Sequence, residues 1–299
     1  MLTRVVPSVA VICAALLWSV DGLLRQDLYS LSSLVIVALE HLIGALIFLP
    51  FLFRSASKIK LLDRRGWISI FWVSICGGLL GTYFYTKALG YVNYIDLSVV
   101  VLIQKLQPLF AISLASIILK EKLSKRFIFL ASIAILGGYL TTFGNKSLLF
   151  LDSKSIIASL LALLASFCWG SSTVLGKDAL KQIPFELVTC IRLIVTGTVA
   201  LLIITLSGNF SDTYSLSFEN YKTIIIIVFT SGSIALSIYY YGLQNLAASH
   251  TAIYELAWPL SAVLLDWLMK GKTLSLTQMI GAIILLSSMT ILIKENSSE

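Results

Sequence analysis

Charged residues are scarce in this chain. Asp, Glu, Lys and Arg make up 12% of its 299 residues, whereas hydrophobic residues make up 58%. Soluble domains carry about 25% charged residues, so this composition excludes an ordinary soluble protein and predicts a polytopic membrane protein. The net charge of +7 is therefore not a nucleic-acid footprint, and no nucleic-acid partner is expected. The distribution of Lys and Arg between loops is informative instead.

Motifs of catalysis and metal binding are also missing. The four cysteines lie singly in apolar stretches without a C-x-x-C pair, which indicates buried small side chains rather than disulfides or a metal site. The sequence contains no P-loop, no nucleophile elbow and no H-E-x-x-H pattern. We therefore expect no enzymatic activity, no cofactor and no bound metal.

Long apolar stretches account for most of the chain. A bilayer crossing needs about 20 predominantly apolar residues. Such stretches cover residues 5–24, 31–53, 67–89, 97–119, 127–143, 155–175, 185–207, 222–243, 251–269 and 277–293. No cleavage site follows the first stretch, so it is expected to remain as a span. The predicted fold class is all-α, with ten transmembrane helices.

The second half of the chain repeats the first at an offset of 151 residues. The matching pairs are Gln104 with Glu255, Pro108 with Pro259, Trp18 with Trp169, and His41 with Arg192. In the third and fourth spans the offset changes to 154, and Tyr85 matches Tyr239. An odd number of spans per repeat turns the second half upside down. The sequence thus predicts two inverted five-helix repeats, residues 1–148 and 149–299.

Pro108 and Pro259 fall inside the fourth and ninth predicted spans. A proline inside a helix removes a hydrogen bond and clashes with the carbonyl four residues back, at a cost of about 3 kcal/mol. The carbonyls freed would be those of Gln104 and Glu255. Helix breaks at matching positions of two repeats point to the binding site of a transporter.

Five ionisable residues lie well inside the predicted spans. A charge at the centre of a span costs about 2.5–3.5 kcal/mol, so each is a functional hypothesis. They are Glu40, His41, Lys105, Arg192 and Glu255. Lys105 lies near the midplane and fits either a positive charge in a substrate cavity or a structural lysine held by a carboxylate. Glu255, beside aromatic residues, fits an ammonium site or a proton carrier.

Glu40, His41, Arg192 and Glu255 are candidates for proton coupling or gating. Glu40 could neutralise the surroundings of His41 or pair with Arg192. The alternative for Glu40 and Arg192 is an ion pair that only holds two spans together. His41 also fits a hydrogen-bonded packing residue.

The candidate substrate-binding set combines polar residues near the two prolines with aromatic residues. Its members are Gln104, Lys105, Glu255, Tyr254, Trp258, Trp18, Trp169, Tyr83 and Tyr240. Packing, or a belt at the membrane interface, is the alternative role for the aromatic members.

The loop charges predict an orientation. With the N-terminus inside, the inner segments hold 13 Lys and Arg residues and the outer segments hold 7. The excess predicts a multi-pass protein of the cytoplasmic (inner) cell membrane with both termini cytoplasmic.

The paired halves, each with a proline-containing fourth span and a basic exit, resemble the EamA-domain permeases of the drug/metabolite transporter superfamily. The resemblance covers nearly the whole chain, and is carried by Trp18, Trp169, Arg192 and the runs 108–110, 259–261 and 120–124. Two departures are His41 in place of an arginine and Lys272 in place of a glutamate. The resemblance implies a basket of helices around a central cavity, with spans five and ten at the periphery. It also implies export or exchange of small metabolites, often amino acids.

Together these patterns predict a secondary transporter, an exporter or exchanger of a small polar or zwitterionic metabolite that works by alternating access. Lys105 would meet a carboxylate or phosphate, and Glu255 would meet an amine or exchange a proton. The expected partners are the small-molecule substrate, the lipid bilayer, and a proton or counter-substrate, while the oligomeric state is left open. A lipid or lipid-linked-sugar flippase and a non-transporting membrane assembly subunit are the alternatives.

Overall fold

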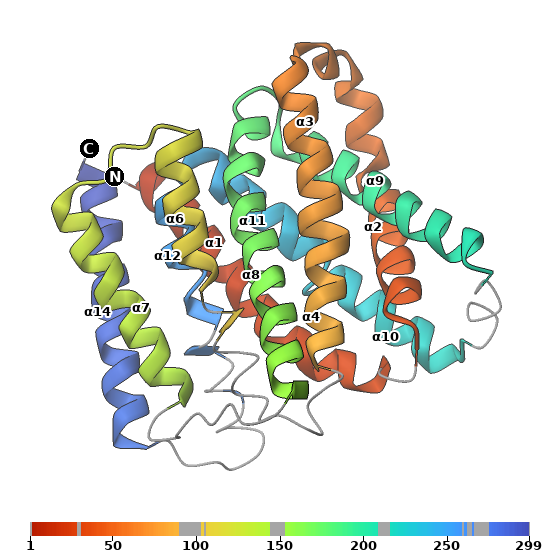
Figure 1. The fold of residues 1–299 in the computed structure, drawn as a ribbon. Coiled ribbons are helices and arrows are strands. Elements are labelled where there is room, and N and C mark those ends of the chain that lie inside the picture. The colour runs from red at the N-terminus through yellow and green to blue at the C-terminus, as the bar shows by residue number, and fades with distance from the viewer. Residues whose placement is uncertain are drawn as a thin grey trace.

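The computed structural model describes residues 2–28, 31–89, 103–104, 106–143, 153–208, 216–258, 260–261, 265 and 275–298. Every regular element in these ranges is helical (Figure 1). Six helices there are long and apolar enough to cross a membrane, and residues 5–21 of α1 and all of α6 are shorter apolar helices. The predicted class, an all-α polytopic membrane protein, is confirmed.

The helices follow the predicted spans closely. In the first half they are α1 (Leu2–Leu24), η1 (Arg25–Leu28), α2 (Ser33–Ser55), η2 (Ala56–Leu61), α3 (Arg64–Trp72), η3 (Val73–Leu80), α4 (Gly81–Leu89), α6 (Gln107–Ile118) and α7 (Lys125–Phe143). In the second half they are α8 (Ser153–Leu180), α9 (Phe185–Leu206), α10 (Phe218–Phe229), α11 (Ser233–Asn245), α12 (Ala248–Tyr254) and α14 (Leu276–Ser298).

Helices from the two halves interlock. α2 packs along α9, α7 along α14, α1 along α11, and α4 along α8. The first two of these contacts join helices that occupy equivalent places in the two repeats. α7 and α14 lie side by side at one edge of the bundle (Figure 1), as the family resemblance implied. The start of α1 and the end of α14 lie at the same end of the bundle.

The third span of each half departs from α-helical geometry at matching positions. η3 is a π-helix, and the backbone N–H of Gly81 after it donates to the carbonyl of Cys76, five residues back. In the second half, the N–H of Gly232 donates to the carbonyl of Ile227 at 2.7 Å, again five residues back. The predicted span 222–243 lies within the apolar stretch Phe218–Asn245, but its helix is interrupted at residues 230–232, between α10 and α11. Such irregularities inside helices frequently occur at functional sites.

The proline breaks differ in detail from the prediction. Pro108 lies in the first turn of α6 rather than inside a helix, and its missing N–H costs nothing there because first-turn N–H groups have no helical partner. The interruption precedes it, at a turn around Leu106. α12 ends at Tyr254, and the carbonyl of Glu255 accepts the N–H of Trp258 at 3.1 Å. Pro259 lies outside the described residues.

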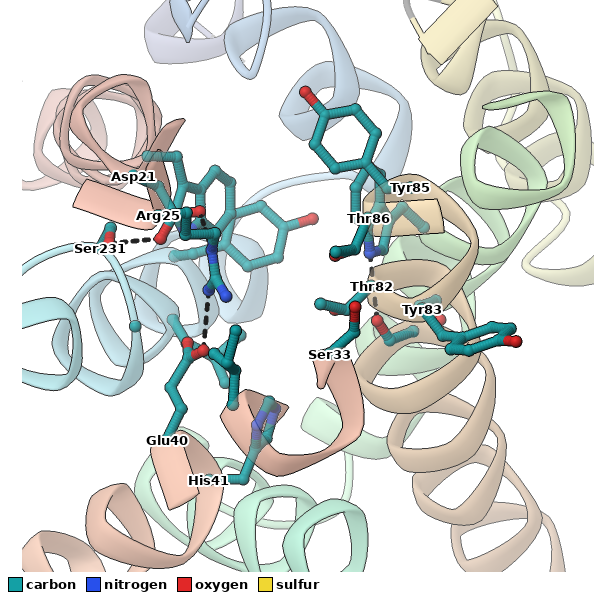
Figure 2. Close-up of a pocket in the computed structure, with 18 of the residues that line it drawn as sticks. Asp21, Arg25, Ser33, Glu40, His41, Thr82, Tyr83, Tyr85, Thr86 and Ser231 are labelled. Carbon is teal, nitrogen blue, oxygen red and sulfur yellow. Dashed lines mark hydrogen bonds and ion pairs between the residues drawn. The ribbon is translucent and has the colours of Figure 1, made fainter. Parts of the chain in front are cut away.

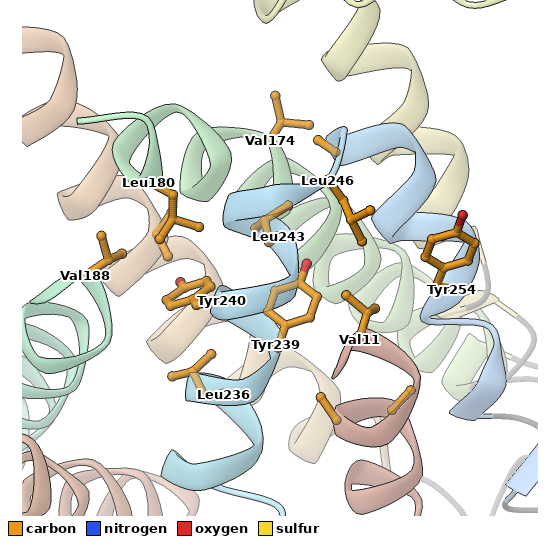
Figure 3. Close-up of a cluster of buried hydrophobic side chains, with 14 of the residues drawn as sticks. Val11, Val174, Leu180, Val188, Leu236, Tyr239, Tyr240, Leu243, Leu246 and Tyr254 are labelled. Carbon is orange, nitrogen blue, oxygen red and sulfur yellow. The ribbon is translucent and has the colours of Figure 1, made fainter. Parts of the chain in front are cut away.

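The largest apolar core surrounds α11. Leu236 and Leu243 of α11 are buried with Val11 of α1 and with Leu180 and Val188 of α8 and α9. Figure 3 shows these side chains converging on α11 from the neighbouring helices. Burial of apolar surface contributes about 25 cal/mol per Å², so this cluster holds α11, which carries several cavity residues, in place.

Candidate functional site

A cavity of about 1050 Å³ lies between the two halves. The described residues that line it come from α1, η1, α2, η3, α4, α6, α8, α9 and α11 and from short segments next to them, among them the stretch that follows α12. Ligand pockets typically measure about 300–1,000 Å³, so this space can hold a small organic molecule. A water-accessible cavity of this size argues against the non-transporting assembly subunit, which required the internal charges to leave no such space.

Two tryptophan–tyrosine pairs form aromatic walls of the cavity. The rings of Trp18 and Tyr239 have centroids 5.1 Å apart and planes inclined by 52°. The rings of Tyr85 and Trp169 have centroids 5.3 Å apart and planes inclined by 57°. Trp18 matches Trp169 and Tyr85 matches Tyr239 in the repeat, so each pair joins one residue from each half. The two pairs are thus symmetry-related, and all four residues line the cavity.

Glu255 is the centre of a hydrogen-bond cluster on the cavity surface. Tyr239 Oη donates to its carboxylate at 2.7 Å, Gln107 Nε2 at 2.5 Å and Thr173 Oγ1 at 3.4 Å. No Lys or Arg among the described residues lies within 4.0 Å of it. A carboxylate has about four acceptor positions, so Glu255 keeps capacity for a donor from a ligand.

A second cluster joins α1, α2 and the break between α10 and α11. Arg25 pairs with Asp21 and, at 2.7 Å, with Glu40, and Ser231 Oγ donates to Asp21 at 2.7 Å. Figure 2 shows these residues on one side of the cavity, with Thr82 and Tyr85 of α4 on the opposite side. A methyl group on Gly232 would lie 3.0 Å from a Glu40 carboxylate oxygen, so the glycine lets the broken helix approach α2.

Glu40 does not pair with Arg192, contrary to one prediction. Its partner is Arg25, which follows span one, while Nη1 of Arg192 donates to Tyr240 Oη at 2.7 Å. His41 is buried and its Nδ1 lies 2.9 Å from the carbonyl of Val37, one turn earlier in α2. This bond agrees with the packing alternative for His41, although the residue also lines the cavity.

Most of the predicted site residues meet at this cavity. Those that line it are Gln104, Glu255, Trp258, Trp18, Trp169, Tyr83, Tyr240, Glu40, His41, Arg192 and Pro108. Tyr254 is fully buried in the apolar core and is not among the described residues of the lining, so its predicted substrate contact is not found (Figure 3). α12 ends at Tyr254, and the chain turns there before Glu255. Lys105 lies outside the described residues.

Several lining residues escaped the sequence reasoning. Gln107 lies one turn after Gln104, and Arg25 lies four residues after Asp21, so helical spacing could have suggested both. Thr173 and Ser231 had no such signal, because their partners Glu255 and Asp21 are distant in sequence. Of the consecutive tyrosines in α11, Tyr239 lines the cavity as well as Tyr240.

A polar layer joins the ends of α8 and α11 at the end of the bundle that carries the termini (Figure 1). Lys177 Nζ donates to the carbonyls of Leu243 and Gln244 at 3.0 and 2.7 Å. In return, Gln244 Nε2 donates to the carbonyls of Leu180 and Ile183 at 2.8 and 3.2 Å. The cavity instead reaches the end of α1, the start of α2 and the end of α4, at the opposite end.

The part of the chain that the structure describes contains no group of three His, Cys, Asp or Glu residues able to hold a metal ion. The formal charges of its cavity lining balance. Asp21, Glu40 and Glu255 are matched by Arg25, Lys87 and Arg192. This arrangement can hold a flat aromatic molecule with no net charge and accept a hydrogen bond from it.

Comparison with known proteins identifies the family. The sequence model of the EamA-like transporter family matches residues 7–143 and again residues 156–294. This chain belongs to the EamA-like transporter family. It is therefore a membrane transporter, as predicted, and each half carries one copy of the family's domain.

One relative within this family covers almost the whole chain. The riboflavin transporter ImpX of Fusobacterium nucleatum is 38% identical over 287 residues, which are 95% of this chain and 96% of that protein. An uncharacterized transporter of Archaeoglobus fulgidus is 25% identical over 124 residues, 42% of this chain and 43% of that one. A solved crystal structure superposes with a TM-score of 0.76 at 18% identity, covering 97% of this chain and 98% of its own, and shows the fold alone.

Proposed function

We propose that this EamA-family protein transports riboflavin across the membrane. The observation that carries the proposal is the symmetric pair of aromatic walls, Trp18–Tyr239 and Tyr85–Trp169, around one cavity. Riboflavin has a flat, fused three-ring isoalloxazine system, and aromatic side chains bind such rings by stacking. The 38% identity with a riboflavin transporter over nearly the full length supports the same substrate.

The balance of charge in the described lining supports an uncharged substrate. Riboflavin is neutral at pH 7, and the three carboxylates of the lining are matched by three cations. One edge of the isoalloxazine ring carries an imide N–H between two carbonyl oxygens. Glu255 would accept this N–H, and the second hydrogen on Gln107 Nε2 would donate to a neighbouring carbonyl. Glu255 is thus the residue that orients the ring in the cavity.

The amino-acid-like substrate predicted from the sequence depended on Lys105 as partner for a carboxylate. It stays a prediction, since Lys105 lies outside the described residues. The orientation with cytoplasmic termini and the repeat boundary at residues 148 and 149 are part of the same proposal. The two family matches, 7–143 and 156–294, support that boundary. Alternating access would open the end now joined by Lys177 and Gln244.

The test is uptake of radiolabelled riboflavin by proteoliposomes that contain the purified protein. We expect saturable uptake that excess unlabelled riboflavin abolishes and that excess amino acids leave unchanged. Trp18→Leu should reduce uptake at low substrate concentration about tenfold, because stacking on one aromatic side chain contributes about 1–3 kcal/mol. Trp67→Leu is the matched control, because Trp67 packs on Phe71 and is not among the described residues of the lining.

Liposomes with protein that accumulate no more riboflavin than empty liposomes would contradict the proposal. Competition by amino acids would instead support the zwitterionic substrate predicted from the sequence. Repeating the uptake at two pH values tests whether Glu255 or His41 carries a coupled proton, since flux that ignores pH removes both from that role.

A further inference from the structure

The cavity contains buried polar atoms that the aromatic walls and Glu255 do not explain. Arg192 Nε, Ser172 Oγ and Ser233 Oγ are buried without a hydrogen-bond partner in the described structure, and all three residues line the cavity. Ser172 is 5% exposed and Ser233 is 1% exposed. Most buried polar side-chain atoms in proteins are hydrogen-bonded, so a group of orphans beside one cavity indicates a missing partner.

Arg192 and Ser172 lie next to each other because Gly77 of η3 leaves room for both. A methyl group on Gly77 would lie 2.4 Å from Ser172 Oγ and 3.6 Å from Arg192 Nη2. Gly77 itself lines the cavity. Three elements, η3, α8 and α9, therefore converge on one small polar spot in the cavity wall.

The guanidinium of Arg192 is only partly satisfied. Its Nη1 donates to Tyr240 Oη at 2.7 Å, and the group lies over the Tyr240 ring, with Cζ 5.6 Å from the centroid. No carboxylate among the described residues lies within 4.0 Å of it. A guanidinium carries five N–H donors, so Arg192 still needs oxygen acceptors and the serine hydroxyls can both donate and accept.

The tyrosines link this spot to the part of the cavity assigned to the flavin ring. Tyr239, which bonds Glu255 and packs on Trp18, is followed in α11 by Tyr240, which bonds Arg192. The two tyrosine rings have centroids 5.8 Å apart. A ligand whose ring contacts Tyr239 therefore has its substituent within reach of the Arg192 side.

Oxygen atoms at this spot could belong to a hydroxylated chain or to a phosphate. A phosphate monoester carries about −1.5 to −2 charges at pH 7. Among the described lining residues, Arg25 is engaged by Asp21 and Glu40 and Lys87 lies against Tyr83, so Arg192 is the cation at this spot. A neutral chain with several hydroxyl groups satisfies the orphan donors without leaving an uncompensated negative charge in the membrane.

We propose that Arg192 and Ser172 form the subsite for the hydroxyl-bearing side chain of the substrate, and that they select riboflavin over flavins without this chain. This inference rests on the proposed riboflavin transport. It adds a second recognition point to the ring contacts, so that the protein recognises both the isoalloxazine ring and the hydroxylated side chain.

The experiment compares riboflavin with lumiflavin, which has the same ring and a methyl group in place of the hydroxylated chain. Each is used as a competitor of radiolabelled riboflavin uptake in proteoliposomes. We expect the wild-type protein to prefer riboflavin about tenfold, because two to three hydrogen bonds are at stake. Arg192→Met keeps the length of the side chain but loses its hydrogen-bond donors. It should weaken competition by riboflavin about tenfold and leave competition by lumiflavin unchanged. Ser172→Ala should have the same effect to a smaller degree.

Glu255→Gln is the matched comparison, because both flavins keep the imide edge that Glu255 contacts. This variant should weaken competition by riboflavin and by lumiflavin equally, so the preference for riboflavin over lumiflavin should not change. Folding of each variant is checked by size-exclusion chromatography and by its melting temperature. Partial recovery of the preference in Arg192→Lys would further support a direct contact.

Three outcomes overturn the inference. Equal competition by riboflavin and lumiflavin in the wild type shows that the protein does not recognise the hydroxylated side chain of riboflavin. An equal loss for both in Arg192→Met shows that Arg192 only supports the fold of the site. Stronger competition by flavin mononucleotide than by riboflavin assigns the subsite to a phosphate. Absence of riboflavin uptake in the wild type is a different result, which removes the proposed function and this inference with it.

Discussion

Tyr239 and Tyr240, consecutive on α11, hold side chains of opposite charge at the cavity. Tyr239 Oη donates to the Glu255 carboxylate at 2.7 Å, whereas Tyr240 Oη accepts from the Arg192 guanidinium at 2.7 Å. Both tyrosines are buried. Neither charged residue has an ion-pair partner among the described residues. Each hydroxyl therefore binds one charged side chain of the same cavity, where both charges stay available to a ligand.

Tyr239→Phe should weaken riboflavin binding about tenfold, since a hydrogen bond to a charged group contributes about 1.5–3 kcal/mol and also positions Glu255. Quenching of flavin fluorescence on titration with purified protein measures the affinity. Tyr241→Phe is the control on the same helix, because Tyr241 packs on Phe185 and is not among the described residues of the lining. Equal affinities for the two variants would show that Tyr239 contributes only its ring.

Glu255 should determine whether the transporter detects the imide N–H of the flavin. Methylation of this nitrogen removes the donor, and we expect the wild-type protein to bind N3-methylriboflavin about tenfold more weakly than riboflavin. In Glu255→Gln the preference should disappear, because Tyr239 and Gln107 each donate to a different carboxylate oxygen of Glu255, and the single oxygen of a glutamine is needed by one of them. Glu219→Gln serves as control, since the Glu219 side chain is 72% exposed and pairs only with Lys222 among the described residues. A preference that persists in Glu255→Gln would assign the imide contact elsewhere.

Features that depend on local sequence were predictable. Apolar length located the spans, and the 151-residue offset placed Trp18 opposite Trp169 and Gln104 opposite Glu255. The scarcity of charge made Glu40, Arg192 and Glu255 stand out, and all three line the cavity. These inferences need only the cost of burying charge and the length of a membrane crossing.

Features that depend on contacts across the fold were not predictable. Ser231 Oγ donates to Asp21, 210 residues away, because the chain is interrupted at Ser231, between the end of α10 and the start of α11. The same break sets the rotation of α11, so helical spacing from the start of the predicted span could not tell that Tyr239 and Tyr240 both reach the cavity. Glu40 pairs with Arg25 rather than with Arg192 because η1, which precedes α2, brings the Arg25 guanidinium to within 2.7 Å of the Glu40 carboxylate. Long-range pairing of this kind leaves no periodic signal in one sequence.

Arg25 should be essential for stability because it neutralises two carboxylates at once. Its side chain is 19% exposed and that of Glu40 is 9% exposed. Arg25→Met leaves Asp21 and Glu40 unpaired, and loss of one partner from a buried pair costs about 3–5 kcal/mol. We expect a large drop in melting temperature in detergent. The double variant with Glu40→Gln should recover part of that loss, because one uncompensated charge is then absent.

An exposed ion pair provides the comparison for Arg25. Lys222 and Glu219 pair at 3.1 Å with side chains 56% and 72% exposed. Lys222→Met should change stability by less than about 1 kcal/mol, since solvent screens such pairs. If Arg25→Met and Lys222→Met shift the melting temperature equally, the Arg25 cluster contributes no more than a surface pair.

Gly137 and Gly138 are neighbours on α7 that should respond in opposite ways to the same substitution. A methyl group on Gly137 would lie 2.8 Å from the backbone nitrogen of Leu285 and 2.9 Å from the carbonyl oxygen of Gly281, both on α14. Backbone atoms cannot move aside as a side chain can, so Gly137→Ala should force α7 and α14 apart and cost about 1–3 kcal/mol. A methyl group on Gly138 would meet only Leu256, at 3.7 Å, so Gly138→Ala should gain about 0.5–1 kcal/mol from the better helix propensity of alanine. Melting temperatures of the two variants measure the difference.

The affinity for riboflavin should stay at the wild-type value in both variants, because α7 and α14 contribute no described residue to the cavity lining. A fall in affinity that accompanies the destabilisation of Gly137→Ala would mean that this peripheral helix pair also shapes the site.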